Sequence, residues 1–147
     1  MEDLFNLGVK AIIRNGQGQM LVLRVSAKEM SNSKHFVGGI TYDIPGGRVE
    51  VDDTIEGTLR KEVKEETNLE LVDYKYLTTV FSPIRLKNQF VDSVGLILAI
   101  YEVQVKEGSI NLNSESDSYE WVTPSEASTM FGDKYPQEFC EYLKNLD

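Results

Sequence analysis

The stretch that decides the fold runs from residue 46 to residue 69: Gly46-Gly47-Arg48-Val49-Glu50-Val51-Asp52-Asp53, then Thr54 through Leu69. It opens on two glycines that follow a proline, a combination typical of a tight turn. Behind the turn, Ile55, Leu59 and Val63 recur every four residues. This spacing produces a narrow apolar stripe and predicts an amphipathic helix over residues 54–67.

The expected helix has a signal at each end. Asp52 and Asp53 lie just before it, where a side-chain oxygen can accept a hydrogen bond from a free backbone N–H group. Asn68 follows it, and Asn tolerates the left-handed conformation in which helices commonly end. We therefore expect an aspartate cap at the start and a left-handed stop at Asn68.

The carboxylates of this helix occupy unfavourable positions. Glu62 and Glu66 are four residues apart, with Glu65 beside them. On a helical wheel of about 100° per residue, Glu66 falls inside the apolar arc and Glu62 borders it. Mutual repulsion, the helix dipole and desolvation all oppose this arrangement. A divalent cation would compensate, and oxygen-only ligands suit Mg²⁺, with Mn²⁺ as the second choice. The alternative is a solvated acidic helix face.

The same stretch resembles the Nudix box, Gly-x5-Glu-x7-Arg-Glu-U-x-Glu-Glu-x-Gly-U, in which U is a bulky aliphatic residue. The matching positions are Gly47, Glu62, Val63, Glu65, Glu66 and Leu69. Three positions depart from the pattern, because Asp53 replaces a Glu, Lys61 an Arg and Asn68 the late Gly. The resemblance implies that Asp53 and Lys61 brace the loop and helix, although Lys lacks the two-pronged geometry of Arg.

The resemblance implies an α/β fold, the Nudix α/β/α sandwich with a mixed β-sheet between helices, over one domain of residues 1–147. It implies Glu62, Glu65 and Glu66 as metal ligands, together with a backbone carbonyl of Gly46 or Gly47. Glu115 lies six residues before Trp121, in an acid-rich stretch like the late loop of the family. Glu62 and Glu115 are both candidates for the general base, and a solvated loop is the alternative for the Glu115 stretch.

Three further residues are candidates for substrate binding. Tyr42 occupies a position where the family often has an aromatic residue before Pro-Gly-Gly, and Arg48 follows the glycines directly. Phe36 belongs to the polar, glycine-containing segment 26–41, which we expect to be a loop. Its ring could stack on a nucleobase, whereas a solvated loop is the alternative.

The remaining patterns predict strands over residues 8–14 and 19–25, joined by the turn Asn15-Gly16-Gln17-Gly18 into a hairpin. Further strands are expected over 71–81 and 90–105, the second of them buried on both faces. The resemblance implies one more strand, which contains Trp121 and follows the acid-rich loop. Thr123 and Glu126 have the spacing of a capping box, and residues 136–146 of an amphipathic helix. Trp121 is expected to be a core residue.

The composition limits the choice of partners. The chain of 147 residues has a formal net charge of −9, which argues against binding of a nucleic-acid polymer. A small polyphosphate is also an anion, and a bound metal can reverse the local sign of the potential. No apolar run is long enough for a membrane span, and the acidic N-terminus does not resemble a signal peptide. We expect a cytoplasmic monomer or homodimer that binds a small-molecule nucleotide.

The resemblance therefore implies a Mg²⁺-dependent hydrolase that cleaves a phosphoanhydride bond in a nucleoside diphosphate linked to another group. The resemblance leaves nucleoside triphosphates, ADP-ribose or nucleotide sugars, and dinucleoside polyphosphates open as substrates. The alternative is a catalytically weak or inactive Nudix-like module that senses nucleotides, which the substitutions at Asp53 and Lys61 would favour.

Overall fold

The computed structural model describes residues 1–31, 39–87 and 89–146. Its elements in chain order are β1 (Phe5–Ile13), β2 (Met20–Val25), α1 (Ala27–Ser31), β3 (Tyr42–Asp43), β4 (Gly46–Arg48), α2 (Ile55–Thr67), β5 (Leu71–Phe81), β6 (Gly95–Val105), β7 (Ser116–Val122), α3 (Pro124–Ser128), the 3₁₀ helix η1 (Gly132–Lys134) and α4 (Gln137–Lys144).

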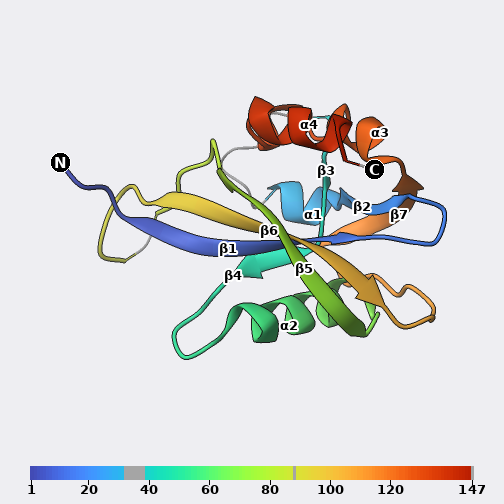
Figure 1. The fold of residues 1–147 in the computed structure, drawn as a ribbon. Helices are drawn as coiled ribbons and strands as arrows, with labels where there is room; N and C mark the ends of the chain where they lie inside the picture. The colour runs from blue at the N-terminus through green and yellow to red at the C-terminus, as the bar shows by residue number, and fades with distance from the viewer. Residues whose placement is uncertain (32–38, 88, 147) are drawn as a thin grey trace.

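Within these residues the strands form two sheets. One has the order β4-β1-β6-β5 and the other the order β3-β2-β7. The first is mixed, because β1 runs parallel to β6 and antiparallel to β4. Helix α2 covers one side of the strands, and α3 and α4 cover the other (Figure 1). The predicted α/β class and its layers are confirmed, with the strand layer divided into two sheets.

The predicted hairpin of the first two strands is wrong beyond its turn. The turn is present, since the Asn15 N–H donates to the Gln19 carbonyl at 3.0 Å. Arg14 and Met20 then form an isolated bridge, after which the strands separate into different sheets. Both faces of each strand are apolar, so each can be buried between other strands. The residues of the turn reverse the direction of the chain, but they do not determine which strands pair with β1 and β2.

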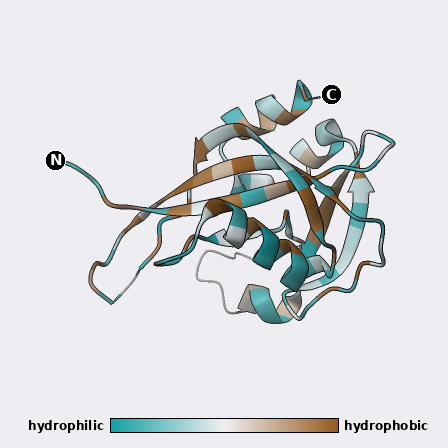
Figure 2. Ribbon diagram, turned by 60° about the horizontal axis from the view of Figure 1, so that its bottom comes forward, coloured by the Kyte–Doolittle hydropathy of each residue, from teal (hydrophilic) through white to brown (hydrophobic). Residues whose placement is uncertain are grey.

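Alternation along the strands supplies two cores. In β2, Met20 and Val22 belong to the cluster under α3 and α4, while Leu21 and Leu23 belong to the cluster under α2. Successive side chains of a strand point to opposite faces, so one strand serves both layers. Figure 2 shows strands rich in hydrophobic residues between helices that also carry hydrophilic ones. The apolar stripe of α2, which consists of Ile55, Leu59 and Val63, packs against the second of these clusters and holds the helix on the strands.

Segment 26–41 differs from the expected loop at its beginning, and residues 32–38 of it lie outside the described part of the chain. Residues 27–31 form helix α1, and the Ser26 hydroxyl accepts a hydrogen bond from the Glu29 N–H at 3.2 Å. Ser26 therefore provides a helix-start signal that the sequence reading missed. The strand expected from residue 90 begins only at Gly95.

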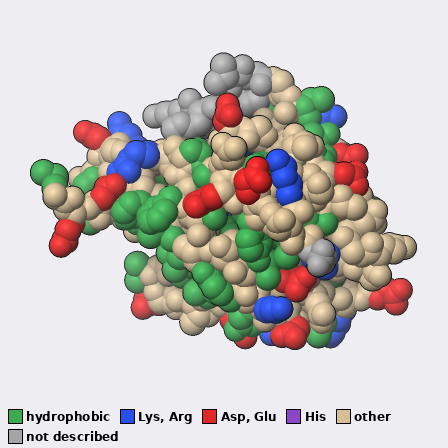
Figure 3. Space-filling view, turned by 45° about the horizontal axis from the view of Figure 1, so that its top comes forward, with side chains coloured by type: hydrophobic (Ala, Val, Ile, Leu, Met, Phe, Trp, Pro, Cys, Tyr) green, Lys and Arg blue, Asp and Glu red, His purple; other side chains and the backbone are tan. Residues whose placement is uncertain are grey.

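The C-terminal expectations are confirmed. Thr123 and Glu126 form the capping box of α3. Helix α4 buries Phe139 and Leu143 completely. In the described part of the chain, no helix has the length and apolar character that crossing a membrane requires. On the face seen in Figure 3, Lys and Arg side chains are scattered among acidic ones.

Candidate active site

Gly46 and Gly47 were expected in a turn, but they begin strand β4, and each position requires glycine for a different reason. A Cβ on Gly46 would lie 2.1 Å from the carbonyl oxygen of Val9, so only glycine fits against β1 there. A Cβ on Gly47 would lie 2.7 Å from the carboxyl group of Glu62. The missing side chains therefore let β4 lie close to both β1 and helix α2.

Hydrogen bonding distinguishes the two glycines. The carbonyl of Pro45 accepts from Ala11, and the N–H of Val49 donates to Leu7, both at 2.8 Å. Polar groups of alternate residues face the same side of a strand, so Gly47 faces β1 with Pro45 and Val49. The Gly46 N–H instead donates to Glu66 Oε2 at 2.9 Å. The polar groups of Gly46 therefore face α2.

Helix α2 ends where the sequence predicts but has a different cap. Thr54, rather than Asp52 or Asp53, is the N-cap, and its hydroxyl accepts from the Gly57 N–H at 2.9 Å. Asn68 adopts the expected left-handed conformation with φ 66°. The expected aspartate cap was wrong because Thr54 is one residue closer to the first free N–H groups.

Asp53 is engaged in a different role. Its carboxylate accepts from the Thr54 N–H at 2.7 Å and from the Thr58 hydroxyl at 3.1 Å. The same side chain lies 3.7 Å from Lys61 Nζ. Two of the three residues that depart from the box, Asp53 and Lys61, are thus paired, and the pair links the loop to the second turn of the helix.

Glu66 is the most unusual acid of the site. It is only 8% exposed, and it faces the Gly46 N–H. Burial raises its pKa to about 8, with further contributions from the negative charges of Glu115 and Glu62. The ammonium group of Lys10 and the Gly46 N–H oppose this rise. The expected place of Glu66 inside the apolar arc is confirmed.

The other acids lie around Glu66 in different environments. Glu62 is half-buried, and its pKa is raised by burial and by the charge of Glu65, which is itself exposed. Glu115 is an exposed residue, yet partial burial of its carboxyl raises its pKa, and the charges of Glu29 and Glu65 add to the rise. Segment 106–115 thus brings Glu115 into the electrostatic field of the helix acids.

The acids do not form a ready metal cage. In residues 1–31, 39–87 and 89–146, no three His, Cys, Asp or Glu side chains are grouped closely enough to hold an ion. One oxygen of Glu66 is bonded to Gly46. Burial of the carboxyl groups is the main physical cause of their raised pKa values, and repulsion between the negative charges adds to it. Their donor atoms are nevertheless all oxygens, which are the ligands that Mg²⁺ uses.

A second polar group next to the site was missed by the sequence reading. Asp43 lies 3.2 Å from Lys10 Nζ and 3.0 Å from Lys134 Nζ, and it accepts a 2.5 Å hydrogen bond from the Tyr135 hydroxyl. Lys10 lies opposite Gly46 in the β1–β4 ladder. The only local signal was a lysine within an apolar strand.

The candidate substrate residues are dispersed. Tyr42 is half-buried against the core under α3 and α4. Arg48 is exposed at the end of β4, opposite Gly8. Phe36 lies outside the described residues. Trp121 was expected in the core and is half-buried at the edge of the cluster under α2.

Comparison with known sequences decides the family. Residues 4–141 match the NUDIX domain. The chain belongs to the Nudix family. This Nudix protein is 27% identical over 140 residues to a MutT-like protein of Streptomyces ambofaciens, covering 95% of the chain and 78% of the relative. It is 28% identical over 118 residues to a Nudix hydrolase of Deinococcus radiodurans, covering 79% of the chain but only 62% of that relative.

Solved structures agree with the family. The Nudix chain is similar to the crystal structure of the MutT protein of Methanosarcina mazei Go1, with a TM-score of 0.74 and 26% identity, over 100% of this chain and 96% of that one. A MutT Nudix hydrolase of Burkholderia pseudomallei shares the fold, with a TM-score of 0.68 at 16% identity, over 99% and 100% of the two chains. The protein is therefore an enzyme of the Nudix pyrophosphohydrolase class.

Proposed function

We propose that this Nudix enzyme is a Mg²⁺-dependent hydrolase of a small nucleotide, in which it cleaves a phosphoanhydride bond of a nucleoside diphosphate linked to another group. Mn²⁺ is the expected substitute metal. The observation that carries the proposal is Glu66, a carboxylate that is 8% exposed and whose pKa rises to about 8 among other acids. A buried carboxylate with a raised pKa adds little to the stability of the folded protein, so its presence here suggests a functional role.

The proposed metal ligands are Glu62, Glu65, Glu66 and one backbone carbonyl. Of the two glycines, we favour Gly46, because its polar groups face α2 whereas those of Gly47 face β1. A bound Mg²⁺ would neutralise phosphate oxygens and lower the pKa of a water molecule. The surplus of carboxylates fits such an ion, since a bound cation would offset both the burial and the mutual repulsion that raise their pKa values.

The chain's own acids would then handle the proton of the attacking water. Glu62 and Glu115 are the two candidates, because each has a raised pKa and neither is bonded to the turn glycines. A general base works best when its pKa lies near the working pH. Arg48, exposed next to the glycines, and Tyr42 are proposed as substrate contacts.

The direct test is phosphate release from a panel of nucleoside triphosphates, ADP-ribose, nucleotide sugars and dinucleoside polyphosphates, with and without Mg²⁺. We expect Glu66→Gln to lower turnover by about a hundredfold or more. The fold should stay intact with a Tm no lower than that of the wild type, because burial disfavours the ionised Glu66 carboxylate. Glu56→Gln is the matched control, since Glu56 is an exposed acid in the first turn of the same helix. Turnover that persists without divalent metal or in Glu66→Gln would refute the metal assignment.

A second variant separates the two candidate bases. If Glu115 is the base, Glu115→Gln lowers the rate constant strongly and leaves the Mg²⁺ affinity unchanged. If Glu62 is the base, the corresponding loss appears in Glu62→Gln together with weaker metal binding, because Glu62 would also be a ligand. The two outcomes differ in the metal titration, not only in the rate.

The nucleotide-sensing alternative predicts binding without turnover in the same panel. The Lys61–Asp53 pair counts against it, because the substituted residues still meet at 3.7 Å. One catalytic domain, a cytoplasmic location and a monomeric or homodimeric state complete the proposal. Light scattering and cell fractionation test the last two.

A further inference from the structure

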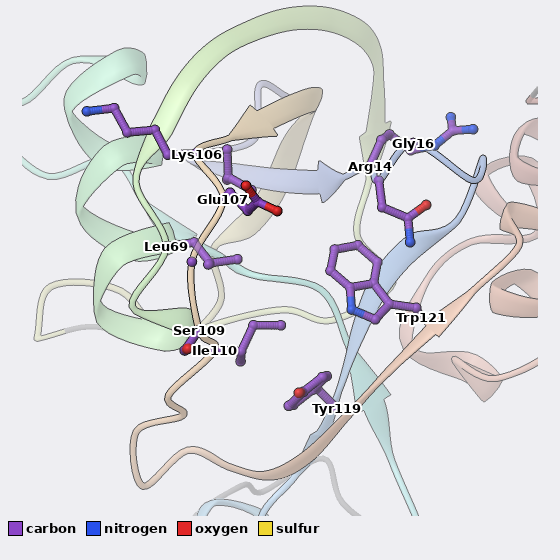
Figure 4. Close-up of a pocket in the computed structure, with 12 residues that line it drawn as sticks. Arg14, Gly16, Leu69, Lys106, Glu107, Ser109, Ile110, Tyr119 and Trp121 are labelled. Atoms are coloured by element: carbon purple, nitrogen blue, oxygen red, sulfur yellow. The ribbon is translucent and has the colours of Figure 1, made fainter.

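A pocket of about 600 Å³ lies apart from the catalytic acids. Its walls come from the turn after β1, the segment after β6, strand β7 and Leu69 just beyond α2 (Figure 4). None of the acids assigned to hydrolysis lines it. The proposed function therefore makes no use of this pocket.

One wall of the pocket is aromatic. Tyr119 and Trp121 are two residues apart in β7, so their rings lie on the same face of the strand. Trp121 is half-buried, and its indole N–H has no hydrogen-bond partner among the described residues. Tyr119 is 44% exposed. Figure 4 shows both rings beside Ile110, across the pocket from Leu69.

The charge turned toward the pocket is negative. The Glu107 carboxylate points into the space near Leu69 and Trp121 (Figure 4), and it forms no ion pair or hydrogen bond with a described residue. The two nearby cations are engaged elsewhere. Lys106 pairs with Glu70 at 3.2 Å, and its ammonium group points away from the pocket.

Arg14 also lines the pocket, but its charged guanidinium group does not face it. Its guanidinium points away from Trp121 (Figure 4) and bonds to Glu102 at 3.3 Å and to the Gly18 carbonyl at 3.2 Å. The pocket therefore offers aromatic faces and one unpaired carboxylate. This combination suits a cation and repels an anion.

We propose that this pocket binds a small organic cation, a substituted ammonium compound, between the Glu107 carboxylate and the rings of Tyr119 and Trp121. Aromatic faces attract ammonium groups, and alkyl substituents lower the cost of removing such a group from water. A metal ion is a poorer fit, because Mg²⁺ or Ca²⁺ needs several oxygen ligands and Glu107 is the only carboxylate in the described lining. The net charge of −9 favours approach of a cation.

The test uses choline as the probe and the full chain in its native state. Trp121 is the only tryptophan of the sequence, so intrinsic indole fluorescence reports on this pocket alone. We expect a saturable change in fluorescence and matching saturable heat in titration calorimetry. The neutral isostere 3,3-dimethylbutan-1-ol should bind at least about tenfold more weakly, because it lacks the charge that both the rings and Glu107 attract.

Variants complete the experiment. Glu107→Gln keeps the size of the side chain and should weaken choline binding about tenfold or more, and Tyr119→Leu should weaken it severalfold. Glu56→Gln removes an exposed carboxylate outside the pocket and should leave binding unchanged, as should Glu66→Gln in the active site. The proposal fails if neither method shows saturation, if the neutral isostere binds equally well, if Glu107→Gln has no effect, or if Glu66→Gln abolishes binding.

Discussion

Replacing Asp43 with Asn tests the polar group beside the active site. The Asp43 carboxylate is 18% exposed and lies between the ammonium groups of Lys10 and Lys134, at 3.2 and 3.0 Å. Asparagine keeps the shape and can still accept the hydrogen bond of the Tyr135 hydroxyl. It removes the negative charge and leaves two largely covered ammonium groups without a counter-ion.

The contribution of ionised Asp43 to the free energy of unfolding follows from the pKa of its carboxyl group. Burial acts to raise it, but Lys10, Lys134 and the Tyr135 hydroxyl outweigh burial and lower the pKa from 3.8 to about 2. The unfolded chain thus binds the proton more tightly, so ionised Asp43 stabilises the fold above its unfolded pKa. One pKa unit corresponds to about 1.4 kcal/mol, which makes the contribution about 2 kcal/mol at pH 7, about 1 kcal/mol at pH 3 and none well below pH 2.

The assay is urea unfolding of the wild type and Asp43→Asn at pH 7, 5 and 3. We expect the variant to lose about 2 kcal/mol at pH 7 and 5, and the difference to narrow at pH 3. Asp117→Asn is the control, because Asp117 pairs with Arg24 at 3.7 Å with both side chains more than 40% exposed, and such pairs contribute about 0–1 kcal/mol. A loss no larger than the control, or one that does not change with pH, would refute the reasoning.

Three further predictions concern the turn and its helix. Gly47→Ala places a Cβ against the flexible Glu62 carboxyl, so steady-state kinetics should show turnover reduced about tenfold or more, with little change in Tm. Gly46→Ala instead places a Cβ against the carbonyl oxygen of Val9, so this variant should lower Tm sharply. Asn68→Ala should cost about 1 kcal/mol in urea unfolding and Asn68→Gly should be neutral or stabilising, because φ is 66°; equal effects would contradict a left-handed stop. Thr54→Ala should cost about 1 kcal/mol through loss of the Gly57 hydrogen bond, and an unchanged free energy of unfolding would contradict its role as the cap.

The sequence alone determined the extent of the site helix and the place of its acids. Helical periodicity, the stop at Asn68 and the position of Glu66 within the apolar arc all depend on residues within a few turns of one another. Such local relations can be read along the chain. The cap was misassigned to Asp52 or Asp53 because these residues and Thr54 are adjacent good caps, and only the backbone shows which one faces the free N–H groups.

Only the tertiary structure decided which strands pair and which charges meet. Strands β1 and β2 carry the local signal of a hairpin, yet both are apolar on two faces and find their partners far along the chain. Lys10, Asp43 and Lys134 come from three separate segments. Their contact depends on strand register and helix packing, which long-range burial selects and no neighbouring residue encodes.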